Sequence, residues 1–127
     1  MTADLFETPE RKDLRATVRR FTEREVVPHL DDWERAGEVP RDLHRAAAKL
    51  GLLGIGFAEE VGGSGGGLLD SVVVTEEIIQ AGGSSGLIAA LFTHGIALPH
   101  IVDAGCPDLV DRFVRPTLDG ELIGSLA

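Results

Sequence analysis

The glycine-rich run at residues 62–67, GGSGGG, is the part of the sequence that comes nearest to a phosphate-binding loop. Such a loop needs successive backbone N–H groups, a helix that follows them and usually a lysine or another cation beside the phosphate. The glycines are present, but no Lys-Ser or Lys-Thr pair follows them, and no window completes the G-x-G-x-x-G pattern. Glu59 and Glu60 also precede the run, and their carboxylates repel a phosphate. We therefore interpret the run as a tight turn between helices.

Residue types that bind metals are present, but their spacing is wrong for a metal site. No two histidines lie at i and i+4, no Glu-x-x-His motif occurs, and Cys106 is the single cysteine. We predict no protein metal site. His94 lies in an otherwise apolar segment, where an ionisable ring is costly unless it is hydrogen-bonded or faces a cavity, and we interpret it as a satisfied core histidine. The histidines are His29, His44, His94 and His100.

Residues that could act as nucleophiles or as acid and base show no catalytic arrangement. No Ser-His-Asp or Cys-His arrangement follows from the spacing, and no base lies beside Cys106, which we interpret as a small buried residue or a cap. Glu76 and Glu77 are adjacent, so on a helix their side chains point about 100° apart and cannot face each other. The sequence therefore predicts no self-contained active site.

The first helix is predicted over residues 8–27. Thr8 can accept a hydrogen bond from an unpaired N–H group of the first turn, and Pro9 suits the first helical position. Pro28 ends the helix because proline cannot donate to the helical ladder. We expect the face that carries the five arginines between Arg11 and Arg24 to be solvated. The apolar face, at i, i+4 and i+7, consists of Leu14, Val18 and Phe21.

Residues 29–39 are interpreted as a connector, in which Trp33 packs on the surface of the core. A second helix begins at Pro40 and carries a complete apolar stripe at i, i+3, i+4 and i+7. Gly51 can take the left-handed conformation just past its end. The stripe consists of Leu43, Ala46, Ala47 and Leu50.

Three more helices are predicted over residues 70–83, 84–105 and 107–120. Asp70 could cap the first of them, and Ser84 and Ser85 cap the second. Residues 87–98 are apolar nearly all round, which predicts a helix buried on all sides, with Pro99 kinking it or marking its last turns.

The predicted fold is all-α, with about five helices in a bundle, and it ends at the first residues of a β strand. Residues 1–121 form the helical domain, and residues 122–127 begin a β domain that is absent from this chain. A strand end without a partner leaves its backbone groups without a ladder. We therefore expect the 127 residues to be the front part of a longer protein.

Composition and charge restrict the classes of function. A hydrophobic fraction of 43% with 26% charged residues is typical of a globular protein and argues against disorder. The net charge of -9 disfavours nucleic acid and anionic lipid as partners. A single cysteine fits a reducing compartment. The N-terminal residues lack the pattern of a signal peptide, and no run reaches about 18 apolar residues, so we expect a cytoplasmic protein that does not cross a membrane.

Three segments in a fixed order carry a resemblance to a known family. They are FTEREVVPHLDDWERAGEVP, LGLLGIGFAEEVGGSGGGLLDSVVVTEEI and, after the apolar helix, GELIGSLA. Together they resemble the N-terminal helical domain of the acyl-CoA dehydrogenases over nearly the whole chain. Ala58 departs from the family pattern, which usually has proline there, and this loosens the loop. The most specific matching positions are Gly51 to Ile55, Glu59, Glu60, Gly62, Gly63, Asp70, Glu76 and Glu77.

The resemblance implies a flavoprotein with an N-terminal helical domain, a middle β domain and a C-terminal four-helix bundle, usually assembled as a homotetramer. In the family, a carboxylate of the C-terminal domain removes the α proton of an acyl-CoA thioester, and the β hydrogen leaves as a hydride to FAD. The middle and C-terminal domains hold the FAD, which passes its electrons to an electron-transfer flavoprotein. The family's Thr-Glu-Pro flavin-contacting motif is absent from this sequence. The resemblance therefore implies that this chain alone is inactive.

Four residues are assigned roles by the resemblance. Leu126 matches a position that lies against the flavin, where leucine offers only apolar contact. Ala89, Phe92 and Ile96 match positions that line the acyl-chain pocket, and their i, i+3 and i+7 spacing puts them on one helix face. A bulky Phe92 is expected to shorten or reshape that pocket. Ordinary helix packing explains the same spacing.

A second interpretation comes from a different class of protein. The chain can be a free-standing helical binding or assembly module that kept the fold and lost the chemistry. The two interpretations differ in whether the coding sequence continues into Thr-Glu-Pro.

Overall fold

The computed structural model describes residues 6–127, and the predicted all-α fold is confirmed. Within these residues no β-sheet forms, and Ile55 and Gly65 make one isolated parallel bridge. The elements, in chain order, are α2 (Pro9–Phe21), the π-helical turn η1 (Thr22–Val26), α3 (Leu30–Ala36), α4 (Arg41–Lys49), the 3-10 turns η2 (Leu52–Gly54) and η3 (Glu59–Val61), α5 (Leu68–Gln80), α6 (Ser85–Phe92), α7 (His94–Ala104), α8 (Pro107–Leu109), the π-helical turn η4 (Val110–Val114) and α9 (Arg115–Leu118).

The predicted capping residues are found at several helix ends. The Thr8 hydroxyl accepts a hydrogen bond from the Arg11 N–H at 3.1 Å, and the Ser84 hydroxyl accepts one from the Leu87 N–H at the same distance. Gly51 follows α4 in the left-handed conformation, with φ of 76°. The helix starts and stops predicted from these residues are therefore confirmed.

The segment expected to be a connector contains a helix instead. Residues Leu30–Ala36 form α3, which ends at Gly37 in the left-handed conformation. Asp31 and Asp32 lie in its first turn, where carboxylates stabilise the positive end of the helix dipole. Trp33 is half-buried and packs against the core, as expected. The prediction of an irregular connector was wrong because Pro28 interrupts the helical path for only a few residues.

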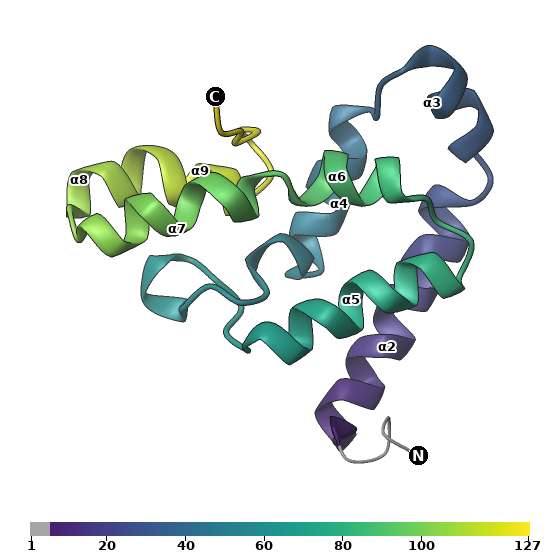
Figure 1. Ribbon diagram of the computed structural model, residues 1–127, viewed down its shortest axis with the longest axis horizontal. Coiled ribbons are helices and arrows are strands. Elements are labelled where there is room, and N and C mark those ends of the chain that lie inside the picture. Colours follow the sequence, from purple (N-terminus) through teal and green to yellow (C-terminus); the bar gives the residue numbers. More distant parts are fainter. Residues whose placement is uncertain (1–5) are drawn as a thin grey trace.

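The long apolar helix predicted over residues 84–105 is divided into two. Helix α6 ends at Phe92 and α7 begins at His94, so the division falls at Thr93, whereas Pro99 lies inside α7. The expectation that this segment is buried on all sides was also wrong, because Ile96 is 60% exposed. Figure 1 shows α6 and α7 as separate coils that extend over different parts of the molecule.

The segment Ser85–Ala104 is long and apolar enough to cross a membrane, judged by length and composition alone, with a mean hydropathy of 1.5. The expectation that no run meets this criterion was therefore wrong. In the structure the segment is divided at Thr93, and it supplies Leu87, Leu91 and Leu98 to the hydrophobic core. These core contacts account for only part of its apolar character, because 22% of the segment is buried.

The core consists of two clusters of buried apolar side chains. The first joins α2, α4, α5 and α6, with Val18, Leu52 and Ile78 among its buried members. The second joins α7 with η4 and α9 through Leu98 and Val114. In Figure 1 the helices of the second cluster lie on the opposite side of the molecule from α2, with the segment between α4 and α5 near the middle.

Residues 122–127, where the start of a strand was predicted, have no regular secondary structure. A strand requires a neighbour to satisfy its backbone N–H and C=O groups. The division of the chain at residue 122 therefore stays a prediction. Gly124 packs closely on the chain, because a Cβ atom at this position would lie 3.2 Å from the Cβ atom of His94.

Candidate functional site

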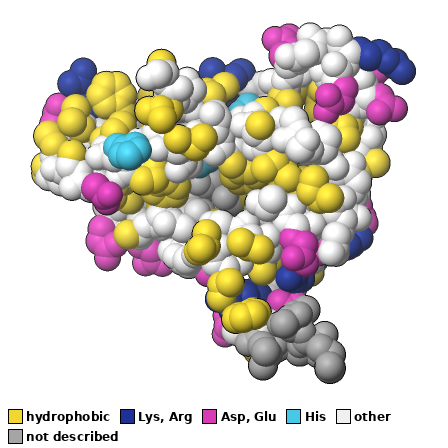
Figure 2. Space-filling model, in the orientation of Figure 1, with side chains coloured by type: hydrophobic (Ala, Val, Ile, Leu, Met, Phe, Trp, Pro, Cys, Tyr) yellow, Lys and Arg dark blue, Asp and Glu magenta, His cyan; other side chains and the backbone are white. Residues whose placement is uncertain are grey.

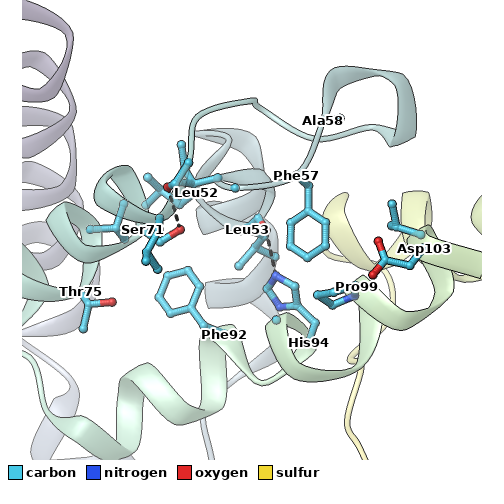
Figure 3. Close-up of a pocket in the computed structure, with 17 residues that line it drawn as sticks. Leu52, Leu53, Phe57, Ala58, Ser71, Thr75, Phe92, His94, Pro99 and Asp103 are labelled. Atoms are coloured by element: carbon cyan, nitrogen blue, oxygen red, sulfur yellow. Dashed lines mark hydrogen bonds between the residues drawn. The ribbon is translucent and has the colours of Figure 1, made fainter.

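A pocket of about 600 Å³ opens between the two core clusters. Figure 3 shows side chains from three regions pointing into it: the segment after α4, the first turns of α5, and the junction of α6 with α7. Its lining is mostly apolar and consists of Leu52, Leu53, Ile55, Gly56, Phe57, Ala58, Gly67, Leu68, Ser71, Val74, Thr75, Phe92, His94, Gly95, Pro99, Val102 and Asp103. This is the volume of a site for a small molecule.

Backbone hydrogen bonds shape the wall that the segment after α4 contributes. The Gly56 N–H donates to the Gly65 carbonyl at 2.9 Å, and the Gly65 N–H donates to the Phe57 carbonyl at 2.8 Å. A Cβ atom at Gly63 would lie 2.1 Å from the Phe57 carbonyl oxygen, so only glycine fits this close approach. The glycine-rich run therefore forms the tight turn that the sequence predicts, and that turn supports Phe57 in the pocket wall.

His94 lies at the junction of α6 and α7, between the rings of Phe57 and Phe92. The ring centroid of His94 lies 5.9 Å from that of Phe57 and 6.3 Å from that of Phe92. Its Nε2 atom lies 2.8 Å from the Leu53 carbonyl oxygen. Because a carbonyl only accepts, we infer that Nε2 carries the proton and donates it. The prediction of a hydrogen-bonded core histidine is confirmed, and the ring also faces the pocket (Figure 3).

Burial lowers the pKa of His94 below its ordinary value of 6.5, because an apolar environment disfavours the imidazolium. The hydrogen bond to the Leu53 carbonyl opposes this effect without cancelling it. His94 is therefore a neutral hydrogen-bond donor that fixes the α6–α7 junction to the segment after α4. It forms part of the pocket wall.

The remaining polar side chains of the pocket are few. Ser71 and Thr75 project from α5, and Asp103 lies near the end of α7. The Ser71 hydroxyl is 3.5 Å from the Gly67 carbonyl oxygen of its own helix. Such a lining suits an apolar chain held by shape, with a small number of polar contacts to orient it.

The four residues assigned by resemblance lie at different distances from this pocket. Phe92 lines it. Ala89 and Ile96 are exposed and are not among its lining residues, although they belong to the same two helices. Leu126 lies in the C-terminal tail and is 62% exposed. The structure thus brings Phe92 into the pocket and leaves the roles of the other three as predictions.

Most lining residues were not predicted individually. Leu53, Phe57, Ser71 and Thr75 come from residues 51–77, the segment that carries the most specific family pattern. Their convergence depends on the turn at residues 62–67, which the spacing of apolar residues does not reveal. The glycine density was the available signal, because closely packed glycines mark a backbone that folds back on itself.

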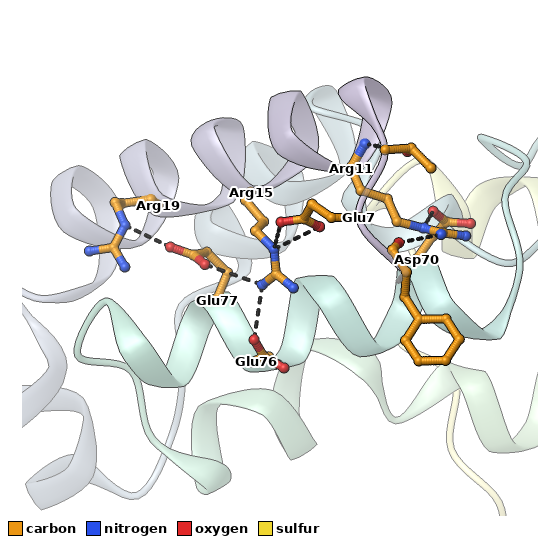
Figure 4. A network of polar contacts seen from close by, with 9 residues as sticks. Glu7, Arg11, Arg15, Arg19, Asp70, Glu76 and Glu77 are labelled. Atoms are coloured by element: carbon orange, nitrogen blue, oxygen red, sulfur yellow. Dashed lines mark hydrogen bonds and ion pairs between the residues drawn. The ribbon is translucent and has the colours of Figure 1, made fainter. Parts of the chain in front are cut away.

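A row of ion pairs between α2 and α5 holds α5 in place beside the pocket (Figure 4). The Arg11 Nε atom lies 3.0 Å from the Asp70 carboxylate, and the Arg19 Nε atom lies 2.6 Å from the Glu77 carboxylate. Arg15 contacts Glu77 and Glu76 at 3.5 and 3.1 Å. The expectation that the basic face of the first helix is solvated was therefore wrong for Arg11, Arg15 and Arg19, which pair with carboxylates of α5. It holds for Arg20 and Arg24, which are exposed.

The ion pairs contribute to shifted pKa values at Asp70 and Arg15. The Gly67 N–H donates to Asp70 at 2.7 Å, and together with Arg11 it lowers the pKa of Asp70 below its ordinary value. Partial burial disfavours the charged form of Arg15, but Glu7 and Glu76 outweigh this effect and raise its pKa. Asp70 takes part in capping α5, because its carboxylate accepts from the Gly67 N–H. The helix begins at Leu68, however, and not at Asp70 as predicted.

Comparison with known proteins identifies the family. Residues 8–121 match the sequence profile described as acyl-CoA dehydrogenase, N-terminal domain. The chain belongs to the acyl-CoA dehydrogenase family. The resemblance drawn from the sequence is thereby confirmed.

Individual relatives agree with this family assignment. The chain is 39% identical over 113 residues to the mitochondrial long-chain specific acyl-CoA dehydrogenase of Mus musculus, a match that covers 89% of this chain and 26% of that protein. Its fold matches a crystal structure of a probable acyl CoA dehydrogenase from Mycobacterium abscessus with a TM-score of 0.92 and 61% identity, over 94% of this chain and 32% of that one. An acyl-CoA dehydrogenase from Geobacillus kaustophilus gives a TM-score of 0.80 at 30% identity, over 92% and 30%. The chain therefore spans about a quarter to a third of the length of these relatives.

Proposed function

We propose that this chain is the N-terminal helical domain of an FAD-dependent acyl-CoA dehydrogenase, and that it forms one wall of the acyl and flavin site. The observation that carries the proposal is the apolar pocket, with Phe92 in its wall, in a domain of this family. The reaction is the α,β-dehydrogenation of an acyl-CoA thioester. The carboxylate that removes the α proton belongs to a part of the protein outside this chain.

In this proposal the acyl chain lies against the junction of α6 and α7. Phe92 supplies an apolar ring, and Val74 and Leu53 continue the apolar surface behind it. The exposed side chains of Ala89 and Ile96 extend the wall when a further domain covers this face. The length of acyl chain admitted depends on how far the Phe92 ring projects into the space.

FAD supplies the hydride acceptor when it is bound. The residues present fit only one edge of this cofactor, because Leu126 offers an exposed apolar side chain and no polar donor. The glycine-rich turn follows Glu59 and Glu60, so it is unsuited to the pyrophosphate. We therefore assign most of the FAD site to the middle and C-terminal domains, and only an apolar contact to Leu126.

The partners follow from the same proposal. The substrate is an acyl-CoA, the electron acceptor is an electron-transfer flavoprotein, and the assembly is a homo-oligomer, in the family most often a homotetramer. A cytoplasmic location accords with the single cysteine, Cys106. Neither nucleic acid nor a membrane is a proposed partner.

The experiment that tests this proposal exchanges the domain in a related protein. Residues 8–121 of this chain replace the matching domain of the Mycobacterium abscessus protein, which is 61% identical to it. We expect acyl-CoA-dependent dye reduction by the chimera and none by residues 1–127 alone. Turnover by the isolated chain contradicts the proposal, and so does a folded, FAD-loaded chimera that turns over no acyl-CoA while the parent protein does.

A further inference from the structure

The turn between α4 and α5 carries Phe57 into the pocket at one end and the short helical turn η3 at the other (Figure 3). Backbone hydrogen bonds make these two ends one unit. The Gly63 N–H donates to the Ala58 carbonyl at 2.9 Å. The Gly65 N–H donates to the Phe57 carbonyl at 2.8 Å. Contacts that hold η3 in place therefore also hold the Phe57 ring.

The same turn passes from one core cluster to the other. Leu52 and Leu53, before it, are buried members of the first cluster. Phe57 and Val61 pack against the second cluster, which contains residues of α7, η4 and α9. Because the pocket lies between the two clusters, the place where η3 is fixed to the second cluster determines where this wall of the pocket stands.

Arg115, the first residue of α9, makes that attachment. Its Nη2 atom donates to the Glu60 carbonyl at 2.5 Å, and its Nε atom donates to the Asp111 carboxylate at 2.9 Å. The contact with Asp111 orients the planar guanidinium toward η3. A Cβ atom at Gly62 would lie 3.4 Å from the Arg115 Cγ atom, so the turn also packs on the arginine stem. Among residues 6–127 no other side chain hydrogen-bonds to the backbone of residues 58–63.

The backbone before Arg115 changes the direction in which this side chain points. The Arg115 N–H donates to the Val110 carbonyl, five residues earlier, as in a π-helix. Pro116 follows and has no N–H group to continue an α-helical ladder. One extra residue in a helical turn rotates the side chains that follow by about 100°. The π-helical turn η4 thus sets the face on which Arg115 stands.

Few apolar contacts hold η3 besides this arginine. Glu59 and Glu60 are exposed, and Val61 is the residue of η3 that packs against the second cluster. A segment with few buried apolar contacts opens locally at a low cost in free energy. The hydrogen bond from Arg115 to the Glu60 carbonyl therefore contributes directly to keeping η3 closed on the second cluster.

We propose that Arg115 is a positioning residue for the acyl pocket, which fixes η3 through the Glu60 carbonyl and thereby keeps the Phe57 ring in the wall that the acyl chain contacts. This role rests on the proposed function, because it takes the pocket as the acyl site. Arg115 is not a lining residue of the pocket, so it acts without touching the substrate. Apolar contact with an acyl chain is made equally in the bound substrate and in the transition state, and its loss raises KM with little change in kcat.

Steady-state kinetics of the full-length, FAD-loaded protein with a series of acyl-CoA lengths test this role. Arg115→Met keeps the stem of the side chain and removes its donors. We expect KM for the preferred acyl-CoA to rise about fivefold or more in this variant, with kcat within about twofold of wild type. Arg112→Met is the matched control, because Arg112 also pairs with an aspartate four residues earlier, at 3.3 Å, and lies outside the pocket. It leaves both constants within about twofold.

Hydrogen exchange of the same proteins without substrate gives a second readout. We expect amide exchange in residues 57–65 to be about tenfold faster in Arg115→Met than in wild type, and unchanged in Arg112→Met. Unchanged exchange in Arg115→Met overturns the proposal, as does an equal rise of KM in the two variants. A fall in kcat without a rise in KM also overturns it, because that result indicates only a loss of folded enzyme.

The two proposals fail in different ways. A wild-type protein that oxidises no acyl-CoA overturns the proposed function, and the role of Arg115 in the acyl site falls with it. An active wild type whose KM is unaltered by Arg115→Met overturns the role of Arg115 alone.

Discussion

Glu77 is the residue on which the pairing of α2 with α5 depends most. Its side chain is 6% exposed, and it contacts Arg19 at 2.6 Å and Arg15 at 3.5 Å. A buried carboxylate is tolerated only when cations and hydrogen-bond donors surround it. Its neighbour Glu76 contacts Arg15 from a position that is 48% exposed. Two adjacent glutamates thus differ sharply in burial, although the sequence shows them as equivalent.

We expect Glu77→Gln to lower the free energy of unfolding by about 1–3 kcal/mol, because two arginines lose their common counterion. This loss of unfolding free energy is smaller than the loss for a fully buried ion pair, because the side chains of Arg15 and Arg19 are 23% and 43% exposed. Glu76→Gln is the matched control, with an expected loss below about 1 kcal/mol. Urea unfolding of both variants measures the difference. Equal losses would contradict the special role assigned to Glu77.

His94 gives the protein a dependence on pH near neutrality. Its pKa in the folded state is lowered from 6.5, so below that pH the unfolded chain binds a proton that the folded chain resists. The stabilisation from the neutral ring is therefore fully present well above pH 6.5, and it is lost progressively as the pH falls from the unfolded pKa through the lower folded pKa. Asp70, whose folded pKa is also lowered, contributes its own loss only near and below its ordinary value of 3.8.

We expect the free energy of unfolding to fall between about pH 7.5 and about pH 5, and the variant His94→Asn to show a flatter dependence over this range. The variant loses stability at pH 7.5 as well, because the hydrogen bond to the Leu53 carbonyl is weakened. His100→Asn, at an exposed position, is the control and keeps the full dependence. An unchanged slope in His94→Asn would assign the dependence to other groups.

At the scale of elements, the turn between α4 and α5 determines the shape of the pocket. Phe57 and Gly65 pair across it, and Gly63 fits against the Phe57 carbonyl where no larger residue can. Ala58 lies at the outer end of this turn with φ of -64° and ψ of 148°. These angles are those of proline, the residue that the family usually has at this position.

We expect Ala58→Pro to raise the free energy of unfolding by about 0.4–1 kcal/mol, because proline restricts the unfolded chain while the folded backbone already has the required φ. Among residues 6–127 the Ala58 N–H makes no backbone hydrogen bond outside the helices, so none is lost. Thermal or urea unfolding measures the change. A loss of stability would contradict this expectation. It would show that the proline ring does not fit the turn, or that the backbone angles of Phe57 are incompatible with a following proline.

Element boundaries were well predicted where a local signal determines them. The signals at these boundaries act through hydrogen bonds or backbone angles within a few residues, so they can be identified from the sequence alone. They are Thr8 with Pro9, Ser84, and Gly51 after α4. Helix α3 was missed because Pro28 just before it predicts a break, although Asp31 and Asp32 in its first turn were an available signal for a helix start. The division at Thr93 has no such local marker, since α6 and α7 separate to join different core clusters.

The candidate site was less predictable than the helices. Phe92 was assigned by resemblance, whereas Phe57, Ser71 and Thr75 reach the pocket only after the chain has turned at residues 62–67. The Arg15 to Glu77 contact likewise joins positions 62 residues apart. Periodicity describes which residues share a face and cannot show what covers that face.

At the scale of the whole molecule, the two core clusters and the pocket between them leave much apolar surface uncovered. Leu68, which lines the pocket, is 80% exposed. Ile96, in α7, is 60% exposed. Figure 2 shows apolar side chains gathered over this face of the molecule. Large exposed apolar areas mark surfaces that another part of a protein covers. Relatives about three to four times as long as this chain supply such parts.

The central claim is that Phe92 in this pocket limits the acyl chain of the substrate. The most direct test measures kcat/KM of the full-length protein against a series of acyl-CoA lengths, for the wild type, Phe92→Ala and the exposed control Phe113→Ala. Each buried methylene contributes about 0.8 kcal/mol, or about fourfold in kcat/KM. We predict that Phe92→Ala shifts the optimum toward longer or bulkier chains and raises the ratio of long to short substrates at least about tenfold, while Phe113→Ala leaves the profile unchanged. An unaltered length profile in a folded, FAD-loaded Phe92→Ala protein would contradict the account.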